Sequence, residues 1–428
     1  MKIGKEKQFK NGTAQPIIIG GGYNGYGLIR SLGEIGIFPI LICGRRISPA
    51  RYSQYISCAW IISDNGEPNR RSREQILNKL GQLNKTALLI PTDEAWVVEL
   101  LDYGKEYRKY GAVYPFCSPD TTKLCLAKDE FAFWCNKNGV LVSRSINFLS
   151  GTDWENFFRE VSRLTFPVVV KPKTKGVGDD GLGFNFYRIF YDYEDLLLWA
   201  ERFGQEGPNV TILAQEFVPG SVENLVSLQG YVDNNEKIWA SQYMKLRQTR
   251  RELGCTNVAV IQNCDDDLIE LNKEILLNKL KFRGFFDIEF KRHQENKQLY
   301  LIEINPRPGM LNYAATLMGL NLPAIALEDL CHYKFYHSSF NSKQKSGWVW
   351  ARLIDDFLYE VMNAFSRRIL SPRRIFSKWY APYKDKKMII DPMWSTKDVK
   401  PGLISLFIWF LEPIRRFLMI VKKFIQVL

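Results

Sequence analysis

The sequence predicts an α/β region followed by an α+β region, and three observations support this fold class. Strands and helices alternate in segments such as "QPIIIGGGYNGYGLIRSLGEIGIFPILICGRR", which is typical of a parallel sheet. Between about residues 120 and 330, apolar strands follow one another in hairpin-like succession, which predicts antiparallel sheets. The rest of the chain is strongly basic. We therefore expect three domains, over residues 1–118, 119–330 and 331–428.

Cysteine and histidine usage argues against a zinc site or a disulfide framework. The 428 residues include eight cysteines, none in a Cys-x-x-Cys pair, and three histidines, His293, His332 and His337. Scattered thiols fit a reducing cytosol, so we expect a cytoplasmic protein. The N-terminus has no apolar signal region, and no apolar run reaches 18 residues, so we expect no membrane span.

The net charge of +12 is unevenly distributed. Beyond residue 330 there are 18 lysine or arginine residues and 7 aspartate or glutamate residues, against 40 and 39 before it. A nucleic-acid-binding surface would spread basic residues over the body of the protein. We therefore expect no nucleic-acid partner, and we look for the function of the positive charge only at the C-terminus.

A glycine-rich turn follows the first strand. Gly20, Gly22 and Gly25 satisfy G-x-G-x-x-G, which is the dinucleotide fingerprint. The acidic residue that would hold a ribose about 20 positions later is missing, and Arg45 and Arg46 stand there instead, where they fit a 2′-phosphate. Two interpretations remain open, a tight strand-to-helix turn or an NADP site.

The stretch "LYLIEINPRPGM" predicts a metal and phosphate site at the end of a strand. Because successive strand side chains point to opposite faces, Glu303 and Asn305 share one face. Pro306 ends regular pairing and directs Arg307 towards the same place. Two oxygen ligands beside one fixed cation are what a magnesium-bound phosphate requires.

A second strand, "FFDIEF", supplies further carboxylates. A short polar loop, residues 292–297, separates it from "LYLIEI", so the two strands are predicted to form a hairpin. Glu289 and Glu303 would then lie on neighbouring strands, where two carboxylates repel unless a cation intervenes. Asp287 lies on the same face as Glu289. Magnesium favours carboxylate and phosphate oxygens, so a nucleotide would complete its ligand shell.

The segment "VVVKPKTKGVGDDGLGF" predicts phosphate binding. Lys171, Lys173 and Lys175 alternate at the end of a strand, and Gly176 and Gly178 follow in a loop whose backbone N–H groups can cradle phosphate oxygens. A solvated basic strand end would have the same pattern. The later stretch "AQEFVPG" offers a backbone that can pair with the edge of an adenine.

Together these motifs resemble the ATP-grasp superfamily of carboxylate–amine ligases over roughly residues 15–330. The order of the motifs also matches: a glycine-rich, Rossmann-like pre-ATP-grasp domain, "LAKDEFAFWCNKNGV", "FPVVVKP", "QEFVPG" and the pair of acidic strands. Within the superfamily, "SPARYSQYISCAW" and "LIPTDEAW" look most like D-aspartate-ligase-type and cell-envelope-associated members, and carbamoyl-phosphate-synthase-like members are also similar.

The resemblance implies ATP and Mg²⁺ as cofactors, with Mn²⁺ as an alternative metal, and small-molecule carboxylate and amine substrates. Lys245 and Arg247, in "MKLRQTRRELG", would bind a substrate carboxylate or the oxyanion, and Arg307 would stabilise the transferring phosphoryl group. The implied nucleotide-binding residues are Lys128 and Lys171 for the phosphates, Gln215, Glu216, Phe217 and Val218 for the adenine motif, and Glu223 for the ribose. The implied magnesium ligands are Glu289, Glu303 and Asn305.

One feature departs from this pattern. Asp179 and Asp180 lie inside the glycine-rich loop, where two anions would repel a triphosphate unless a lysine or another cation offsets them. The sequence thus favours an ATP-dependent ligase over two alternatives: an NADP-dependent oxidoreductase that uses the N-terminal turn, and a non-catalytic nucleotide-binding protein.

The C-terminal stretch "PGLISLFIWFLEPIRRFLMIVKKFIQVL" predicts a basic amphipathic helix. Beyond Pro413, cations recur at helical spacing opposite an apolar side, which suits the surface of an anionic membrane. The alternatives are a helix packed on the protein's own core and a contact in a homodimer. The cations are Arg415, Arg416, Lys422 and Lys423.

Overall fold

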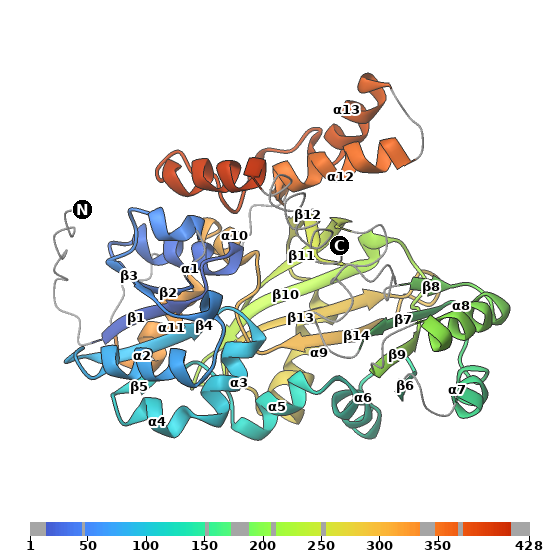
Figure 1. Cartoon of the computed structure of the whole chain (residues 1–428), viewed down its shortest axis with the longest axis horizontal. Coiled ribbons are helices and arrows are strands. Elements are labelled where there is room, and N and C mark those ends of the chain that lie inside the picture. The colour runs from blue at the N-terminus through green and yellow to red at the C-terminus, as the bar shows by residue number, and fades with distance from the viewer. Residues whose placement is uncertain are drawn as a thin grey trace, which may run out of the picture.

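The protein folds around three β-sheets, which Figure 1 shows from left to right. The computed structural model describes residues 14–44, 48–149, 154–172, 188–206, 211–249, 254–333, 347–366 and 371–411. Within these ranges the sheets have five, seven and four strands. The chain is therefore a mixed α/β protein with parallel and antiparallel sheets, as the sequence predicts.

The first sheet is parallel, with the strand order β3-β2-β1-β4-β5. Helix α1 lies on one face of the sheet, and α2, α3 and α4 lie on the other, where their apolar side chains meet Ile17 and Ile19. This burial on both faces explains the continuous apolar runs of the strands. The elements are β1 (Ala14–Ile19), α1 (Tyr23–Gly33), β2 (Ile40–Cys43), β3 (Cys58–Ile61), α2 (Arg70–Leu80), β4 (Thr86–Pro91), α3 (Glu94–Asp102), α4 (Gly104–Arg108) and β5 (Ala112–Val113).

The central sheet has the order β14-β13-β10-β11-β12-β15-β16, and all its pairs are antiparallel except β15–β16. One face packs on α5, α6 and α9 through residues such as Leu228, Phe286 and Ile288. The other face carries the polar residues of the site. The elements are α5 (Pro119–Leu126), α6 (Lys128–Lys137), β10 (Leu225–Val232), β11 (Ile238–Gln248), β12 (Thr256–Gln262), α9 (Asp266–Asn272, continued by a π-helical segment to Lys279), β13 (Gly284–Arg292), β14 (Leu299–Asn305), β15 (Trp348–Ala351) and β16 (Met388–Ile390).

A smaller antiparallel sheet has the order β6-β9-β7-β8. Helices α7 and α8 cover it, and Phe157, Val161, Leu196 and Ala200 pack against its buried valines. This sheet presents Lys171 and Gln215 to the site. The elements are β6 (Ser145–Leu149), α7 (Trp154–Val161), β7 (Val168–Pro172), β8 (Arg188–Phe190), α8 (Tyr193–Glu206) and β9 (Thr211–Glu216).

The chain returns to the first sheet after the central hairpin. Helices α10 (Asn312–Leu317) and α11 (Leu322–Cys331) pack with α1, so that Ala315, Leu322 and Leu327 join the core around Ile18. Helices α12 (Leu353–Ser366) and α13 (Pro372–Tyr380) and a helix over residues 399–411 follow. Figure 1 shows these three helices together along one edge of the molecule.

Buried Asp398 fastens the last part of the chain to the first. Its carboxylate accepts hydrogen bonds from Tyr26 Oη at 3.0 Å, from the Gln54 backbone N–H at 3.2 Å and from the Ser53 hydroxyl. Arg30 Nη1 donates to the Asp391 carbonyl at 3.2 Å. The basic C-terminal part is thus joined to the first sheet, and through β15 and β16 it also extends the central sheet.

Two further expectations concern thiols and membrane helices. All eight cysteines are free thiols, as their spacing predicts. In the part of the chain that the structure describes, no helix is long and apolar enough to cross a membrane. The predicted amphipathic helix with Arg415, Arg416, Lys422 and Lys423 lies outside the described residues.

Candidate active site

The hairpin of β13 and β14 brings the predicted acidic residues together. Glu289 lies directly opposite Glu303, and Asp287 lies directly opposite Asn305. A β-bulge leaves Ile302 without a partner on β13, because Glu289 pairs with Glu303 while Phe290 pairs with Leu301. The predicted pairing of the two acidic strands is confirmed.

Lys245 neutralises part of this negative charge. Its Nζ donates to Glu289 Oε1 at 2.7 Å, and the side chain is buried. Burial by itself lowers the pKa of Lys245. The carboxylates of Glu289, Asp287 and Glu303 together raise the pKa by more than burial lowers it, so the net shift is upward. Lys245 therefore remains an ammonium group beside the two acidic strands.

Asp287 is the most deeply buried carboxyl group of the hairpin. Burial, followed by the neighbouring Glu289 carboxylate, raises the pKa of Asp287 to about 7. Its Oδ1 is buried, with no hydrogen-bond partner among the described residues. The nearby cations Arg307 and Lys245 lower the pKa of Asp287, but they offset the upward shift only in part.

Arg307 follows the hairpin and reaches across to the first sheet. Its Nη2 lies 3.5 Å from Glu94 Oε1 and 3.4 Å from Asn305 Oδ1. Its Nη1 donates to the Pro308 carbonyl at 3.3 Å, while its buried Nε has no hydrogen-bond partner in the described part of the chain. The guanidinium is thus held at the end of the hairpin, and these contacts leave its Nε–H unused.

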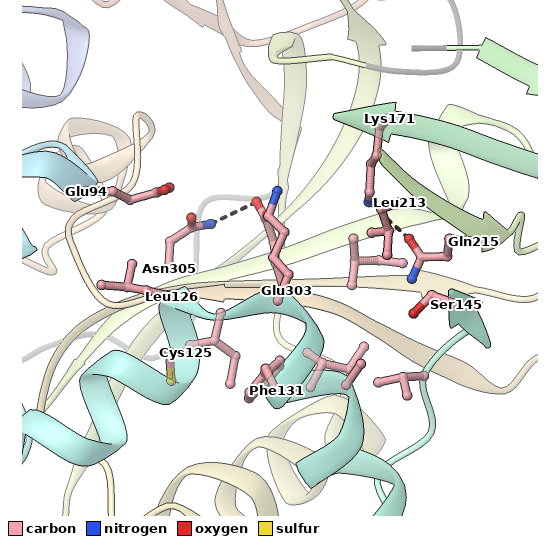
Figure 2. A pocket seen from close by; sticks show the side chains of 16 residues that line it. Glu94, Cys125, Leu126, Phe131, Ser145, Lys171, Leu213, Gln215, Glu303 and Asn305 are labelled. Carbon is pink, nitrogen blue, oxygen red and sulfur yellow. Dashed lines mark hydrogen bonds between the residues drawn. The ribbon is translucent and has the colours of Figure 1, made fainter. Parts of the chain in front are cut away.

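A cleft of about 670 Å³, open solvent included, lies between the β14 side of the hairpin and the small sheet. Glu303 and Asn305 line it, whereas Lys245, Asp287, Glu289 and Arg307 do not. Figure 2 shows Glu303 and Asn305 between Glu94 on one side and Lys171 and Gln215 on the other. Lys171 Nζ donates to Gln215 Oε1 at 3.0 Å, and Lys128, at the start of α6, also lines the cleft.

The residues after Gln215 are oriented by contacts with their own sheet. Glu216 accepts a hydrogen bond from the Thr165 backbone N–H at 2.8 Å, and the Phe217 backbone N–H donates to the Pro167 carbonyl at 2.8 Å. Lys291 lies 3.7 Å from the centre of the Phe217 ring. Val218 is buried and Glu223 is exposed. These four residues follow the strand that carries Gln215 but do not line the cleft.

Three predicted phosphate-binding residues, Lys173, Gly176 and Gly178, lie outside the described residues, as do Lys175, Asp179 and Asp180.

Arg247 is not brought to the acidic hairpin with Lys245. A register shift on β11 pairs Lys245 with Ala259 and Arg247 with Val258, so the two side chains leave opposite faces of the sheet. The guanidinium of Arg247 lies 2.8 Å from Asp356 and 3.8 Å from Glu360, and it donates to the carbonyls of Lys378 and Trp379. In this structure Arg247 anchors α12 and α13.

The sequence analysis did not identify the apolar lining of the cleft or two of its polar residues, Glu94 and Ser145. Glu94 is the first residue of α3 and follows β4 of the parallel sheet. Ligands of such sheets bind at the carboxyl ends of the strands, and this rule would have pointed to "PTDEAW". For Ser145 we see no comparable signal in the sequence.

Close packing accounts for the glycine-rich turn. Gly20 has φ +107°, and a Cβ on Gly25 would lie 1.8 Å from the Gly20 carbonyl oxygen. Asn24 donates to the carbonyls of Thr92 and Pro308, so the turn also abuts the segment after Arg307. These contacts favour the tight turn over the NADP site; Arg45 and Arg46 lie outside the described residues.

Comparison with known proteins supports the resemblance that the sequence motifs predict. No family model matches the chain. Over 387 residues the chain is 22% identical to the D-aspartate ligase of Enterococcus faecium. The matched region covers 87% of this chain and 86% of that protein. The resemblance to the ATP-grasp carboxylate–amine ligases thus extends over most of the chain.

Solved structures share the ATP-grasp fold. A biotin carboxylase complex with β-γ-ATP from Campylobacter jejuni has a TM-score of 0.59 at 16% identity, and covers 79% of this chain and 74% of that chain. The L-amino acid ligase from Bacillus licheniformis has a TM-score of 0.56 at 13% identity, and covers 80% of this chain and 79% of that chain.

The residues of this site fit a magnesium-bound nucleotide. Among the described residues, no group of three or more histidine, cysteine, aspartate or glutamate side chains is arranged to hold a metal ion. Magnesium, however, takes one or two carboxylates together with phosphate oxygens. Glu289, Glu303 and Asn305 supply oxygen donors of this kind, and Asp287 lies beside them, with an Oδ1 that has no hydrogen-bond partner within the described ranges.

Proposed function

We propose that the chain is an ATP- and Mg²⁺-dependent ligase that activates a carboxylate as an acyl phosphate and joins it to an amine. The observation that carries this proposal is the single cleft in which Glu303 and Asn305 face Lys171 and Gln215. Such a cleft places metal-binding oxygens opposite cations that suit phosphates.

Each group of residues has a role in this reaction. Lys128 and Lys171 neutralise the nucleotide phosphates. Gln215, which lines the cleft, meets the nucleoside, and Glu216 to Val218 and Glu223, which lie outside the cleft, complete the nucleoside site only if the bound nucleotide extends beyond it. Glu289, Glu303 and Asn305 hold the metal, which when bound neutralises charge on the transferring phosphoryl group. Arg307, whose buried Nε is unpaired within the described chain, stabilises the same group.

The bonds made and broken are these. An oxygen of the substrate carboxylate bonds to the γ-phosphorus as ADP leaves. The amine nitrogen then attacks the acyl carbon, through an oxyanion that Arg307 and Lys245 stabilise, and inorganic phosphate leaves as the amine loses a proton. Arg247 is not part of this step, because it pairs with Asp356 on the other face of the sheet.

The proposal also includes a division of the chain into three domains. Residues 1–118 form a Rossmann-like pre-ATP-grasp domain, residues 119–330 form the ATP-grasp region, and residues 331–428 form a basic extension. The substrates are an amino acid, a peptide or a cell-envelope precursor, handled in the cytoplasm. The relative from Enterococcus faecium is named a D-aspartate ligase, so D-aspartate is the first carboxylate to test.

ADP release tests the proposal. The protein is incubated with Mg²⁺, ATP and pairs of amino acids or amines, starting with D-aspartate, and the products are identified by mass spectrometry. We expect ADP release that requires both substrates and is lost in Glu303→Gln. ATP binding without ADP release over the whole screen would favour a non-catalytic nucleotide-binding protein.

Calorimetry separates the ligase from the oxidoreductase alternative. We expect heat of binding for ATP with Mg²⁺ and none for NADPH. Binding of NADPH without binding of ATP would favour the oxidoreductase alternative, in which the glycine-rich turn binds the cofactor.

A further inference from the structure

The helix over residues 399–411 has an unusual surface. From Leu403 to Leu411, eight of nine residues are apolar, and none of the nine is fully buried. Leu403, Phe407 and Phe410 recur at helical spacing and are 52%, 54% and 61% exposed. A surface helix of a soluble domain normally turns its apolar side to the core and a polar side to water. This helix, with Ser405 as its one polar residue in that stretch, has no such polar side.

Helix α13 lies along the same edge of the molecule (Figure 1), and its sequence includes three aromatic residues. Seven of its nine residues are exposed. Phe376 and Tyr380 stack with their ring centres 5.9 Å apart, and both rings are exposed. Apolar and aromatic side chains are thus gathered in a region where the described structure does not bury them.

The charge around these side chains is strongly positive. Between residues 371 and 411 one acidic side chain, Asp385, is exposed. Asp398 is turned inward to Tyr26, and Asp391 accepts hydrogen bonds from the backbone of Met393 and Trp394. The exposed cations in this range are Arg373, Arg374, Lys378, Lys384, Lys386, Lys387, Lys397 and Lys400.

We propose that this helical layer, residues 371–411, docks on the surface of a bilayer that contains anionic phospholipids. Apolar and aromatic side chains enter the headgroup boundary while lysine and arginine meet the lipid charge. The sequence beyond residue 411 continues with four further cations and one acid. A second copy of the chain fits less well, because two such layers would bring like charges together. This role goes beyond the ligase activity and does not depend on it.

Vesicle co-sedimentation of the full-length protein tests the proposal. We compare vesicles of phosphatidylcholine alone with vesicles that contain about 30% phosphatidylglycerol, at low salt and at about 0.5 M salt. We expect binding to the anionic vesicles at low salt, and at least about tenfold weaker binding to neutral vesicles or at high salt.

Substitutions assign the binding to this surface. Leu403→Ser/Phe407→Ser/Phe410→Ser should weaken binding to anionic vesicles at least about tenfold. The control is Leu198→Ser, which removes a 66% exposed leucine from α8 and should bind like the wild type. Melting temperature and ADP release verify that each variant is folded. If the triple variant fails to fold, Lys386→Glu/Lys387→Glu tests the same surface through its charge.

Three outcomes would overturn the proposal. The first is that the wild-type protein stays in solution when it is mixed with anionic vesicles at low salt. The second is that the folded variants bind these vesicles as strongly as the wild type does. The third is a homodimer, measured by light scattering, that the triple substitution dissociates; this result would assign the surface to a second copy of the chain.

Discussion

Lys245 Nζ lies 2.7 Å from Glu289 Oε1 although strand β10 separates their strands. The lysine supplies a positive charge to a face that also carries Asp287 and Glu303. The contact gives the acidic hairpin an internal cation, and a bound metal would compete with that cation for Glu289.

Lys245→Gln should therefore destabilise the metal-free protein and increase its response to metal. Loss of one partner of a buried ion pair lowers the free energy of unfolding by about 3 kcal/mol. The rise in melting temperature on adding Mg²⁺ with ATP should be larger than in the wild type, because the metal then relieves more repulsion. Scanning fluorimetry measures both. Lys279→Gln, from a more exposed pair with Glu274, is the control and should leave the response unchanged. An equal metal response in Lys245→Gln would show that metal and lysine do not compete.

Glu303→Gln should abolish turnover and leave the fold intact. The change removes a charge that faces Glu289 while it keeps the volume of the side chain. Since metal-assisted charge stabilisation contributes several kcal/mol, ADP release should fall at least about a hundredfold. Mn²⁺ binding, followed by electron paramagnetic resonance, should weaken in parallel. The exposed Glu270→Gln serves as the control. Wild-type ADP release by Glu303→Gln would show that the hairpin is not the metal site.

Arg307→Lys should reduce kcat about tenfold or more, because a point charge replaces a planar fork that contacts both Glu94 and Asn305. Steady-state kinetics should show a smaller change in KM than in kcat. Arg292→Lys, in a partly exposed pair with Asp267, is the control and should keep the wild-type kcat. An unchanged kcat in Arg307→Lys would remove this residue from the mechanism.

Asp287 should make the stability of the metal-free protein depend on pH. Burial raises the pKa of Asp287 from 3.8 to about 7. Between these values the folded protein keeps a proton that the unfolded chain releases, so stability falls as the pH rises, by at most about 1.4 kcal/mol per pH unit, and levels off above about 7. The Asp287→Asn variant has no carboxyl proton to lose at this position. Its free energy of unfolding should therefore lack this part of the pH dependence. Urea unfolding in chelator between about pH 5 and 7.5 measures the difference. Parallel curves for the two proteins would contradict the assignment.

Asp398→Asn should destabilise the fold without touching the cleft. The amide lacks the charge that accepts hydrogen bonds from Tyr26, Ser53 and Gln54 in a buried setting. A loss of about 2 kcal/mol or more in the free energy of unfolding is expected. Chemical denaturation measures it, and kcat of the folded fraction should stay at the wild-type value. Equal stability would mean that the C-terminal part is held by its apolar contacts alone.

The acidic hairpin could be predicted from the sequence because residues that are close together in the chain determine it. Two-residue alternation placed Glu303 and Asn305 on one face, and a short polar loop set Glu289 opposite Glu303. The same alternation failed for Arg247. One extra residue at Leu246 moved the guanidinium to the other face, and a bulge of this kind has no clear signal in the sequence.

Other parts of the structure depend on contacts between distant segments. Glu94 reaches the cleft only because the first sheet abuts the segment after Arg307. Strands β15 and β16 are short. Strand β15 takes its place in the central sheet by pairing with β12, about 90 residues earlier in the chain, and β16 then pairs with β15. Local patterns carry no information about such pairings.

The contact between Tyr26 and Asp398 joins residues that are 372 positions apart. A ribosome therefore releases the first helix long before the partner that completes its surroundings exists. Until nearly the whole chain has been synthesised, the hydroxyls of Tyr26 and Ser53 lack their acceptor. We expect the nascent protein to remain incompletely packed for most of its synthesis, and chains that terminate early to be substrates for chaperones and proteases.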